Sequence, residues 1–359
     1  MERAANGRER QCVAGRGRAC QTPRAVRHAL AVLLGVVQRS IRLHALLAPP
    51  ERVLVAVSGG ADSTGMLLAL AQLRTKLDIE LVAAHVNHRL RGADAERDEA
   101  CAAQNAAALN IPFVRTELPA DFGRGANLEA RARQLRYGAL RRLANEHGCA
   151  KIATGHTLDD QAETVVMRLL RGSGGRGLGA IRPRRADGVI RPLIDCRRTD
   201  VEAVVRQAGL AYRLDDSNRD RRFLRTHVRE RVLPMLAALN PSIARACANL
   251  AAAARAERQI VTEWADARLE IGTDKGQLDV IWLRTIPAPL RALLVRRWLL
   301  RAGVAARGLT ARHVEAVRGL AESARGGTET HLPGGWTVRR TAHRLRADRL
   351  TSLRRGQAR

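Results

Sequence analysis

A short glycine-rich segment constrains the fold of this chain more than any other feature. Ser58-Gly59-Gly60-Ala61-Asp62-Ser63 follows directly on the apolar run 52–57 and leads into the apolar segment 64–70. β-Branched residues, then glycines and hydroxyls, then a leucine-rich stretch predict a strand, a tight loop and a helix. Glycines let backbone N–H groups turn towards an anion at a helix N-terminus, where the dipole favours negative charge. The segment therefore predicts a phosphate-binding loop.

Side chains of this loop add to its backbone donors. Ser58 and Ser63 can donate hydroxyl groups, and an acid such as Asp62 beside phosphate is explained mainly if Mg²⁺ lies between them. The spacing of a Walker A loop is absent. SGGADS instead resembles the pyrophosphate loop of the ATP pyrophosphatases, which split ATP into AMP and pyrophosphate. We expect all six residues to contact ATP, and Asp62 also Mg²⁺. A glycine-rich turn without a ligand is the alternative.

Strands and helices alternate through the first half of the chain. Apolar runs predict further strands at 79–85, 112–118, 151–154 and 189–194, and the segments between them have helical periodicity. This alternation is typical of a mostly parallel sheet covered by helices on both faces. The expected fold is α/β, a doubly wound, mostly parallel five-stranded sheet, followed by a smaller, mainly helical C-terminal domain.

Two polar motifs follow strands of this sheet. His85-Val-Asn-His-Arg-Leu-Arg-Gly92 ends the second strand, and Gly155-His-Thr-Leu-Asp-Asp-Gln-Ala-Glu-Thr164 follows the fourth. Ligands of such sheets bind beyond the carboxyl ends of the strands. We assign the side chains of residues 85 and 87 to ATP, and the guanidinium groups of Arg89 and Arg91 to phosphate. A histidine that merely ends a strand is the alternative for residue 85.

Three carboxylates share the first turn of the helix that follows the fourth strand. They belong to Asp159, Asp160 and Glu163. Complementing the helix dipole, at about 0.3–1 kcal/mol each, is the simplest role for such acids. Adjacent acids beside a phosphate loop are better explained by a metal or an ammonium group. We therefore count these three residues, with Asp62, as catalytic candidates.

A second glycine-rich segment is a decoy. Residues 172–177 satisfy G-x-G-x-x-G, but they follow a helix rather than a strand, which argues against a dinucleotide site. A basic loop that contacts RNA or substrate is the better interpretation, with Arg171 and Arg176 as phosphate contacts.

Composition narrows the class of protein. The net charge of +27 favours a polyanionic partner, although only three of the 62 basic residues are lysines, a bias that a GC-rich genome would impose on any surface. The six cysteines show no metal-ligand spacing, which indicates a reduced compartment. The apolar stretch 29–37 is about half of the roughly 20 residues that a membrane helix needs. We therefore expect a cytoplasmic protein without a membrane partner.

The expected domain organisation has four parts. Residues 1–24 are expected to be a disordered or mis-annotated extension. Residues 25–218 form the ATP-binding catalytic domain, residues 219–349 a mainly helical, basic domain, and residues 350–359 a basic tail. Aromatic residues make up 3% of the chain, so phosphate and shape contacts with a folded RNA are favoured over base stacking. A solvated arginine-rich helix face is the alternative.

In this order the motifs resemble the tRNA(Ile)-lysidine synthase family. The matching stretches are VLVAVSGGADS, HVNHRLRG, NLEARARQLRY, GHTLDDQAET, RLLRGSGGRGL, RPLID and DDSNRDRRFLRTHVRERVLPML. The resemblance implies that free L-lysine is ligated to C2 of wobble cytidine 34 of the CAU-anticodon isoleucine tRNA. It implies an adenylated cytidine intermediate, with ATP converted to AMP and pyrophosphate. On this basis residues 219–349 become a tRNA-binding domain, with Arg225 and Arg229 as tRNA contacts.

The chain departs from the family pattern at two positions. Thr157 stands where the family usually has a second histidine, and Thr226 where it usually has asparagine. Two other functions stay open: a different tRNA-modifying enzyme with the same loop, such as a thiolase, and a non-catalytic basic RNA-binding protein. The oligomeric state is also open, with a homodimer as one option.

Overall fold

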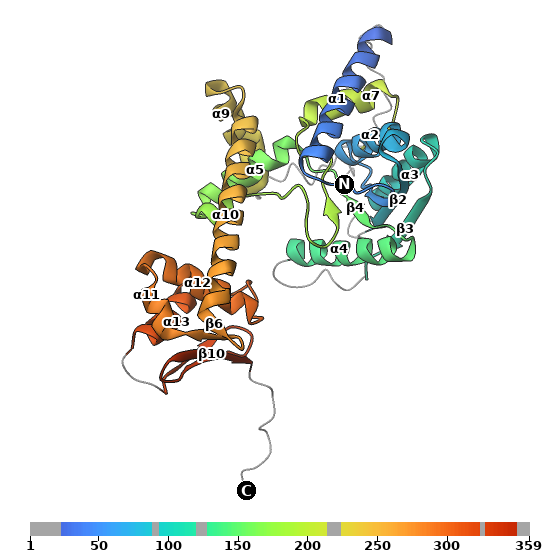
Figure 1. Ribbon diagram of the computed structural model, residues 1–359. Helices are drawn as coiled ribbons and strands as arrows, with labels where there is room; N and C mark the ends of the chain where they lie inside the picture. Colours follow the sequence, from blue (N-terminus) through green and yellow to red (C-terminus); the bar gives the residue numbers. More distant parts are fainter. Residues whose placement is uncertain (1–22, 88–92, 120–127, 214–223, 324–326, 350–359) are drawn as a thin grey trace, which may run out of the picture. The chain divides into compact units, whose positions relative to one another are not determined.

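The computed structural model describes residues 23–87, 93–119, 128–213, 224–323 and 327–349 (Figure 1). The expectations for residues 1–22, for the tail 350–359, and for Arg89 and Arg91 lie outside the described residues. The chain divides into two compact units, Met1–Ala254 and Arg255–Arg359.

The first unit is built on a parallel sheet. Its strands are β1 (Glu51–Ala56), β2 (Ile79–Asn87), β3 (Phe113–Glu117), β4 (Lys151–Ala153) and β5 (Val189–Ile190), in the order β3-β2-β1-β4-β5. Every pairing between neighbours is parallel. The expected five-stranded parallel sheet is confirmed. β5 is shorter than the predicted run 189–194 because a turn follows it, in which Ile194 N–H donates to the Arg191 carbonyl.

Helices cover both faces of this sheet, as the alternation predicts (Figure 1). Alternate residues of β1 serve different layers: Val53 and Val55 pack with α1 (Pro23–Leu43), α2 (Ala61–Leu77), α3 (Ala93–Ala108) and α7 (Arg198–Gln207). Leu54 faces the other way and packs against α4 (Leu128–Glu146). A strand that is apolar on both faces is what a sheet buried between two helical layers requires.

A helical cluster completes the first unit. It contains α5 (Leu158–Leu170), α6 (Gly175–Leu178), α8 (Leu224–His227), a π-helix η3 (Val228–Val232), α9 (Leu233–Leu239) and the first part of α10 (Ile243–Gly272). Leu158 and Val165 of α5 pack there with Val228 and Ala251. We expected the second domain to begin near residue 219, whereas the division into compact units falls after Ala254.

The second unit combines helices with a small sheet. Its helices are the rest of α10, α11 (Val280–Thr285), α12 (Ala288–Arg301) and α13 (Ala311–Glu322). Its strands are β6 (Thr273–Asp274), β7 (Gln277–Asp279), β8 (Glu329–Leu332), β9 (Trp336–Arg340) and β10 (Arg344–Arg349), in the antiparallel order β6-β7-β10-β9-β8. The expected C-terminal helical domain is confirmed, whereas its small antiparallel sheet was not foreseen.

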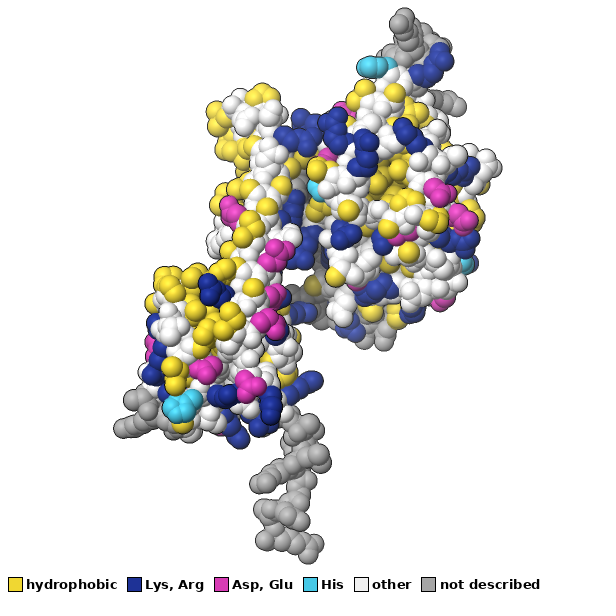
Figure 2. Space-filling view, in the orientation of Figure 1, with side chains coloured by type: hydrophobic (Ala, Val, Ile, Leu, Met, Phe, Trp, Pro, Cys, Tyr) yellow, Lys and Arg dark blue, Asp and Glu magenta, His cyan; other side chains and the backbone are white. Residues whose placement is uncertain are grey.

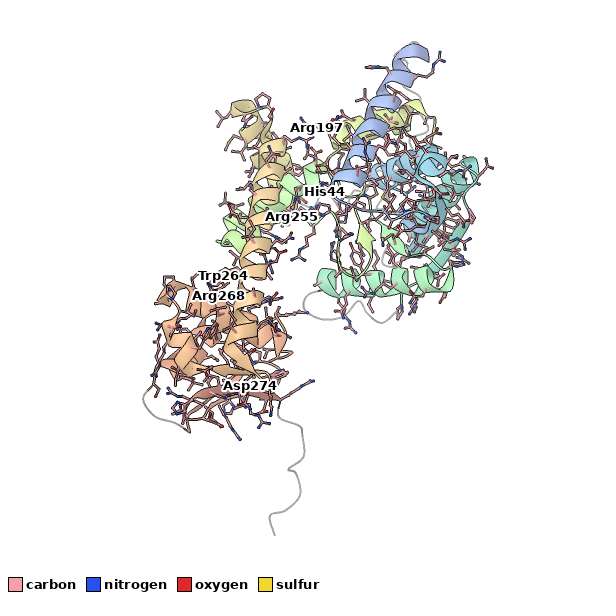
Figure 3. All side chains as sticks on the ribbon, in the orientation of Figure 1. His44, Arg197, Arg255, Trp264, Arg268 and Asp274 are labelled. Carbon is pink, nitrogen blue, oxygen red and sulfur yellow. The ribbon has the colours of Figure 1, made fainter. Side chains whose placement is uncertain are left out.

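Aromatic side chains stabilise this second unit. Trp298 is buried and its indole N–H donates to the Gly276 carbonyl at 2.9 Å. On α10, the guanidinium carbon of Arg268 lies 5.9 Å from the ring centre of Trp264 (Figure 3). Among the described helices of the chain, none has the length and apolar character needed to cross a membrane.

Candidate active site

The glycine-rich loop joins β1 to α2, as the sequence predicts. Gly59 has φ +80°, and a Cβ atom there would lie 2.8 Å from the carbonyl oxygen of Asp98. Gly60 is the residue before the first turn of α2. The hydroxyl of Ser63 accepts from the Ser58 N–H at 3.0 Å and donates to the Gly60 carbonyl at 2.9 Å. Ser63 therefore closes the loop on itself in this structure, which leaves the backbone N–H groups of the α2 N-terminus as the main anion donors.

A second segment far along the chain holds this loop. The N–H of Arg213 donates to the Gly59 carbonyl at 2.9 Å. Its guanidinium group donates to Asp98 at 2.6 Å and to Asp94 at 2.9 Å, both on α3. Arg213 thus links the loop to α3, a role that the sequence did not suggest.

Asp62 lies in the first turn of α2, beside the loop. One carboxylate oxygen accepts from Arg198 Nε at 3.0 Å, and the other is buried with no hydrogen-bond partner among the described residues. Burial raises the pKa of Asp62 to about 6, against the opposing effect of Arg198. A partly compensated carboxylate with an unused oxygen fits a cation ligand. Mg²⁺ is commonly held by one or two carboxylates together with substrate phosphates, so Asp62 fits this ion.

Arg198 connects Asp62 to the acidic start of α5. Its guanidinium group donates to Asp160 at 2.9 Å and lies 3.4 Å from Glu163, and its backbone N–H donates to Asp159 at 2.7 Å. Burial alone would lower the pKa of Arg198, but the three carboxylates around its side chain raise it. The structure therefore brings all four predicted catalytic acids to one arginine that sequence reasoning missed.

A signal for Arg198 was present in the sequence. Arg197 precedes α7 and Arg198 is its first residue. Positive charge at a helix N-terminus is unfavourable because it opposes the helix dipole. An arginine at the start of a helix is therefore expected to pair with acidic residues of other elements. Asp159 supplies one of them by accepting the first N–H of α7.

Asp160 and Glu163 are fully engaged. Asp160 accepts from the Thr157 N–H at 2.8 Å in a capping box, and from Arg225 at 2.7 Å. Glu163 is completely buried and accepts from Arg225 at 2.7 Å and from Arg229 at 2.6 Å. Although burial would raise the pKa of Asp160, the neighbouring cations lower it to about 2.

These contacts bear on several predicted roles. Arg225 and Arg229 bind carboxylates in this structure, and their contact with tRNA stays a prediction. A lysine or metal contact of Asp160 and Glu163 stays a prediction. Thr157, one of the departures from the family pattern, has the specific role of capping α5.

The two predicted ATP contacts, His85 and Asn87, lie on the last residues of β2, and His85 is beside the loop. His85 is buried, and its Nδ1 donates to the carbonyl of Val57 at 2.9 Å, one residue before Ser58. Burial lowers the pKa of this imidazole. Because a carbonyl only accepts, the proton is on Nδ1, which leaves Nε2 as an acceptor. The amide of Asn87 donates to Glu99 at 3.3 Å.

Comparison with known proteins places this geometry in a family. Residues 36–236 match the PP-loop domain model, and residues 278–346 match the TilS substrate binding domain model. The chain is 36% identical over 328 residues to the tRNA(Ile)-lysidine synthase of Salinispora tropica, covering 89% of this chain and 97% of that protein. The chain belongs to the tRNA(Ile)-lysidine synthase family.

Relatives of this family differ in length. The chain is also 36% identical over 300 residues to the tRNA(Ile)-lysidine synthase of Geobacter sulfurreducens, which covers 81% of this chain but 63% of that relative. Among solved structures, the U34-tRNA thiolase NcsA from Methanococcus maripaludis, with its [4Fe-4S] cluster, is similar with a TM-score of 0.51 and 20% identity. That likeness covers 62% of this chain and 78% of the thiolase, and it shows a shared fold.

Proposed function

We propose that this member of the lysidine synthase family ligates free L-lysine to C2 of cytidine 34 in the CAU-anticodon isoleucine tRNA. The family is one of ATP-dependent ligases that modify tRNA(Ile). The observation that carries the residue-level proposal is the position of Asp62. It lies in the helix turn beside the glycine-rich loop, with one oxygen unpartnered among the described residues and the other linked through Arg198 to the acids of α5.

The ATP site in this proposal uses the loop and the end of β2. Ser58, Gly59, Gly60, Ala61 and Ser63 contact the phosphates, mainly through the backbone N–H donors at the N-terminus of α2. Nε2 of His85 and the amide of Asn87 serve the nucleoside. Asp62 would hold Mg²⁺, which supplies stabilisation of the charge on the leaving pyrophosphate.

The first chemical step activates the base. The O2 carbonyl oxygen of the cytosine attacks the α-phosphorus of ATP, the bond to the β-phosphate bridging oxygen breaks, and pyrophosphate leaves. The loop contributes fixed N–H donors to this step, and such preorganised dipoles stabilise developing charge without rearrangement. Holding base and phosphate together supplies a further part of the acceleration.

The second step consumes lysine. Its ε-amine attacks C2 of the adenylated cytidine and AMP leaves. At neutral pH the amine must first lose a proton, which costs roughly 5 kcal/mol given its ordinary pKa. A carboxylate that binds the ammonium can also accept that proton. We assign this role first to Asp159, because its bond to the backbone of Arg198 occupies one oxygen only. Asp160 and Glu163 would contribute after their arginines move.

Radioactive lysine tests the proposal directly. The protein is incubated with labelled lysine, ATP and the CAU isoleucine tRNA, and label in the RNA is measured with AMP and pyrophosphate. A tRNA with uridine at position 34 is the matched control. We expect one AMP per lysine incorporated, and label only in the cytidine tRNA. Absence of label, with pyrophosphate released on another substrate, would refute the proposal.

The larger organisation follows from this function. We assign residues 25–218 to catalysis, and residues 219–349, which include the matched substrate-binding segment, to the tRNA. An enzyme that acts on tRNA before translation would work in the cytoplasm.

A further inference from the structure

A basic cavity lies next to the acidic cluster of the first unit. Its volume is about 710 Å³, and its walls come from α4, α5, α8 and the segment 180–191. Seven arginines line it: Arg133, Arg168, Arg171, Arg182, Arg185, Arg191 and Arg225. Asp187 is its one acidic wall residue. Figure 2 shows dark-blue Lys and Arg side chains on the visible face of this unit. The cavity itself is defined by the wall residues named above.

Most of this positive charge is uncompensated. Arg185 pairs with Asp187, and Arg225 pairs with Asp160 and Glu163. The other five wall arginines have no carboxylate partner among the described residues. Burial lowers the pKa of Arg168 and of Arg191, and the Nε of Arg191 is buried without a hydrogen-bond partner among the described residues. Arg191 is buried, whereas Arg133, Arg171 and Arg182 are exposed, and like charges gathered on one wall attract an anion.

The cavity is separate from the proposed ATP contacts but adjoins the acidic cluster. Its walls do not include any residue of the loop 58–63, nor His85 or Asn87. They do include Arg225, which donates to Asp160 and Glu163, and Thr164, which donates to the Asp160 carbonyl at 2.7 Å. A ligand in the cavity would therefore lie beside the acids.

The wall residue His156 has a side chain that is uncharged at neutral pH. Burial lowers the pKa of His156 to about 3, and its Nδ1 lies 3.2 Å from the hydroxyl of Thr154. A neutral imidazole among arginines is suited to the edge of a nucleobase rather than to phosphate. The cavity thus combines strong anion attraction with a neutral hydrogen-bonding wall.

Charge discriminates among the three substrates of the proposed reaction. Free lysine carries a net positive charge, which this cavity repels. ATP is assigned to the loop. RNA carries one negative charge per nucleotide, and its backbone is bound mainly through arginine and lysine. We propose that the cavity binds the phosphates on either side of the cytidine that is modified, an inference that rests on the proposed function.

Paired arginine variants test the cavity. Arg171→Gln with Arg182→Gln removes two exposed wall charges that have no carboxylate partner among the described residues. Arg142→Gln with Arg206→Gln removes two exposed charges outside the cavity and is the matched control. We expect the cavity variant to bind the tRNA at least about tenfold more weakly. The slope of the logarithm of its association constant against the logarithm of salt concentration should become less steep by about 1.4, because two single-strand phosphate contacts are lost. An equal effect in the control would overturn the proposal.

Neutral phosphate analogues locate the contact on the RNA. An anticodon stem-loop with methylphosphonates on both sides of cytidine 34 should bind wild-type protein about tenfold more weakly than the natural stem-loop. It should bind the cavity variant with almost no further loss, because both changes remove the same contacts. Independent, multiplicative losses would place the flanking phosphates elsewhere. A rise in KM for lysine or for ATP, with tRNA affinity unchanged, would assign the cavity to that substrate instead.

The two proposals can fail separately. Lysine incorporation by the wild-type protein tests the proposed function, whereas the binding measurements need no turnover. A protein that binds the tRNA through this cavity but incorporates no lysine would contradict the reaction and retain the RNA site. A protein that incorporates lysine while both arginine variants bind alike would contradict the cavity alone.

Discussion

Replacing Arg198 by methionine tests whether one guanidinium group holds the acids of the active site together. The side chain contacts Asp62, Asp160 and Glu163, at 3.0, 2.9 and 3.4 Å. Methionine keeps much of the apolar stem and removes the charge. We expect Arg198→Met to lower the free energy of unfolding of the first unit, and to do so mainly at high pH.

The magnitude follows from what each acid retains. Removing one partner of a buried ion pair costs about 3–5 kcal/mol, because a charge is left without compensation. Asp160 and Glu163 keep Arg225 and Arg229, whereas Asp62 loses its one arginine partner among the described residues. The loss should therefore lie near the lower end, about 3 kcal/mol at pH 8.

The pH dependence comes from Asp62. Its pKa is raised from 3.8 to about 6, so the folded state binds this proton more tightly than the unfolded state. Stability linked to this group therefore decreases as pH rises from about 4 to about 6 and is constant above. Loss of Arg198 raises the pKa further and extends the decrease to higher pH. At pH 5 Asp62 is mostly protonated in both proteins, and the difference should shrink to about 1 kcal/mol.

Urea unfolding at pH 5 and pH 8 provides the measurement, with circular dichroism as the signal. All four tryptophans, at 264, 282, 298 and 336, belong to the second unit, so their fluorescence follows that unit as an internal control. Asp62→Asn with Arg198→Met removes the uncompensated charge and should recover about 2 kcal/mol at pH 8. Equal losses at both pH values, with no recovery in the double variant, would show that Arg198 acts through packing alone.

Three further predictions follow from single residues. Gly59→Ala should raise the KM for ATP and lower the free energy of unfolding by about 1–2 kcal/mol, because φ is +80° and the new Cβ would meet the Asp98 carbonyl. Gly60→Ala, whose Cβ has room, is the control and should change KM and stability far less. Gly272→Ala places a Cβ 2.1 Å from the Trp282 ring, so it should shift the fluorescence transition by about 1–3 kcal/mol, and a transition unchanged from wild type would contradict the packing. The logarithm of kcat/KM should decline below about pH 6, where Asp62 takes up a proton, and a profile that is level down to pH 5 would remove Asp62 as the Mg²⁺ ligand.

The parallel sheet and the phosphate loop were predictable because their signals are local. Residues 53–57 before Ser58 are all apolar, as a strand between two helical layers requires, and the glycines mark the turn that follows. The carboxyl ends of such strands gather on one edge, so the acids of α5 could be placed beside the loop from strand order alone. The arginines that pair with these acids could not be predicted in this way.

Long-range ion pairs explain what the sequence analysis missed at the site. Arg198 and Asp62 are separated by 136 positions, and Arg213 and Asp98 by 115. Neither contact has a periodic signal, because each depends on how separate elements fold together. The small antiparallel sheet was missed for a related reason. Arg340 of β9 is buried, with its guanidinium group on backbone carbonyls at the end of α13, where a strand pattern would lead one to expect an apolar residue.

The many arginines of this chain have distinct functions, and this limits what net charge can predict. Arg340 donates to the carbonyls of a helix end, and Arg198 pairs with three acids, so neither adds a charge that RNA could use. Arg171 and Arg182 line a cavity without a carboxylate partner among the described residues. Only charges of this second kind attract phosphate. The argument for an RNA surface therefore depends on which arginines lack acidic neighbours, and the cavity beside α5 is where several of them meet.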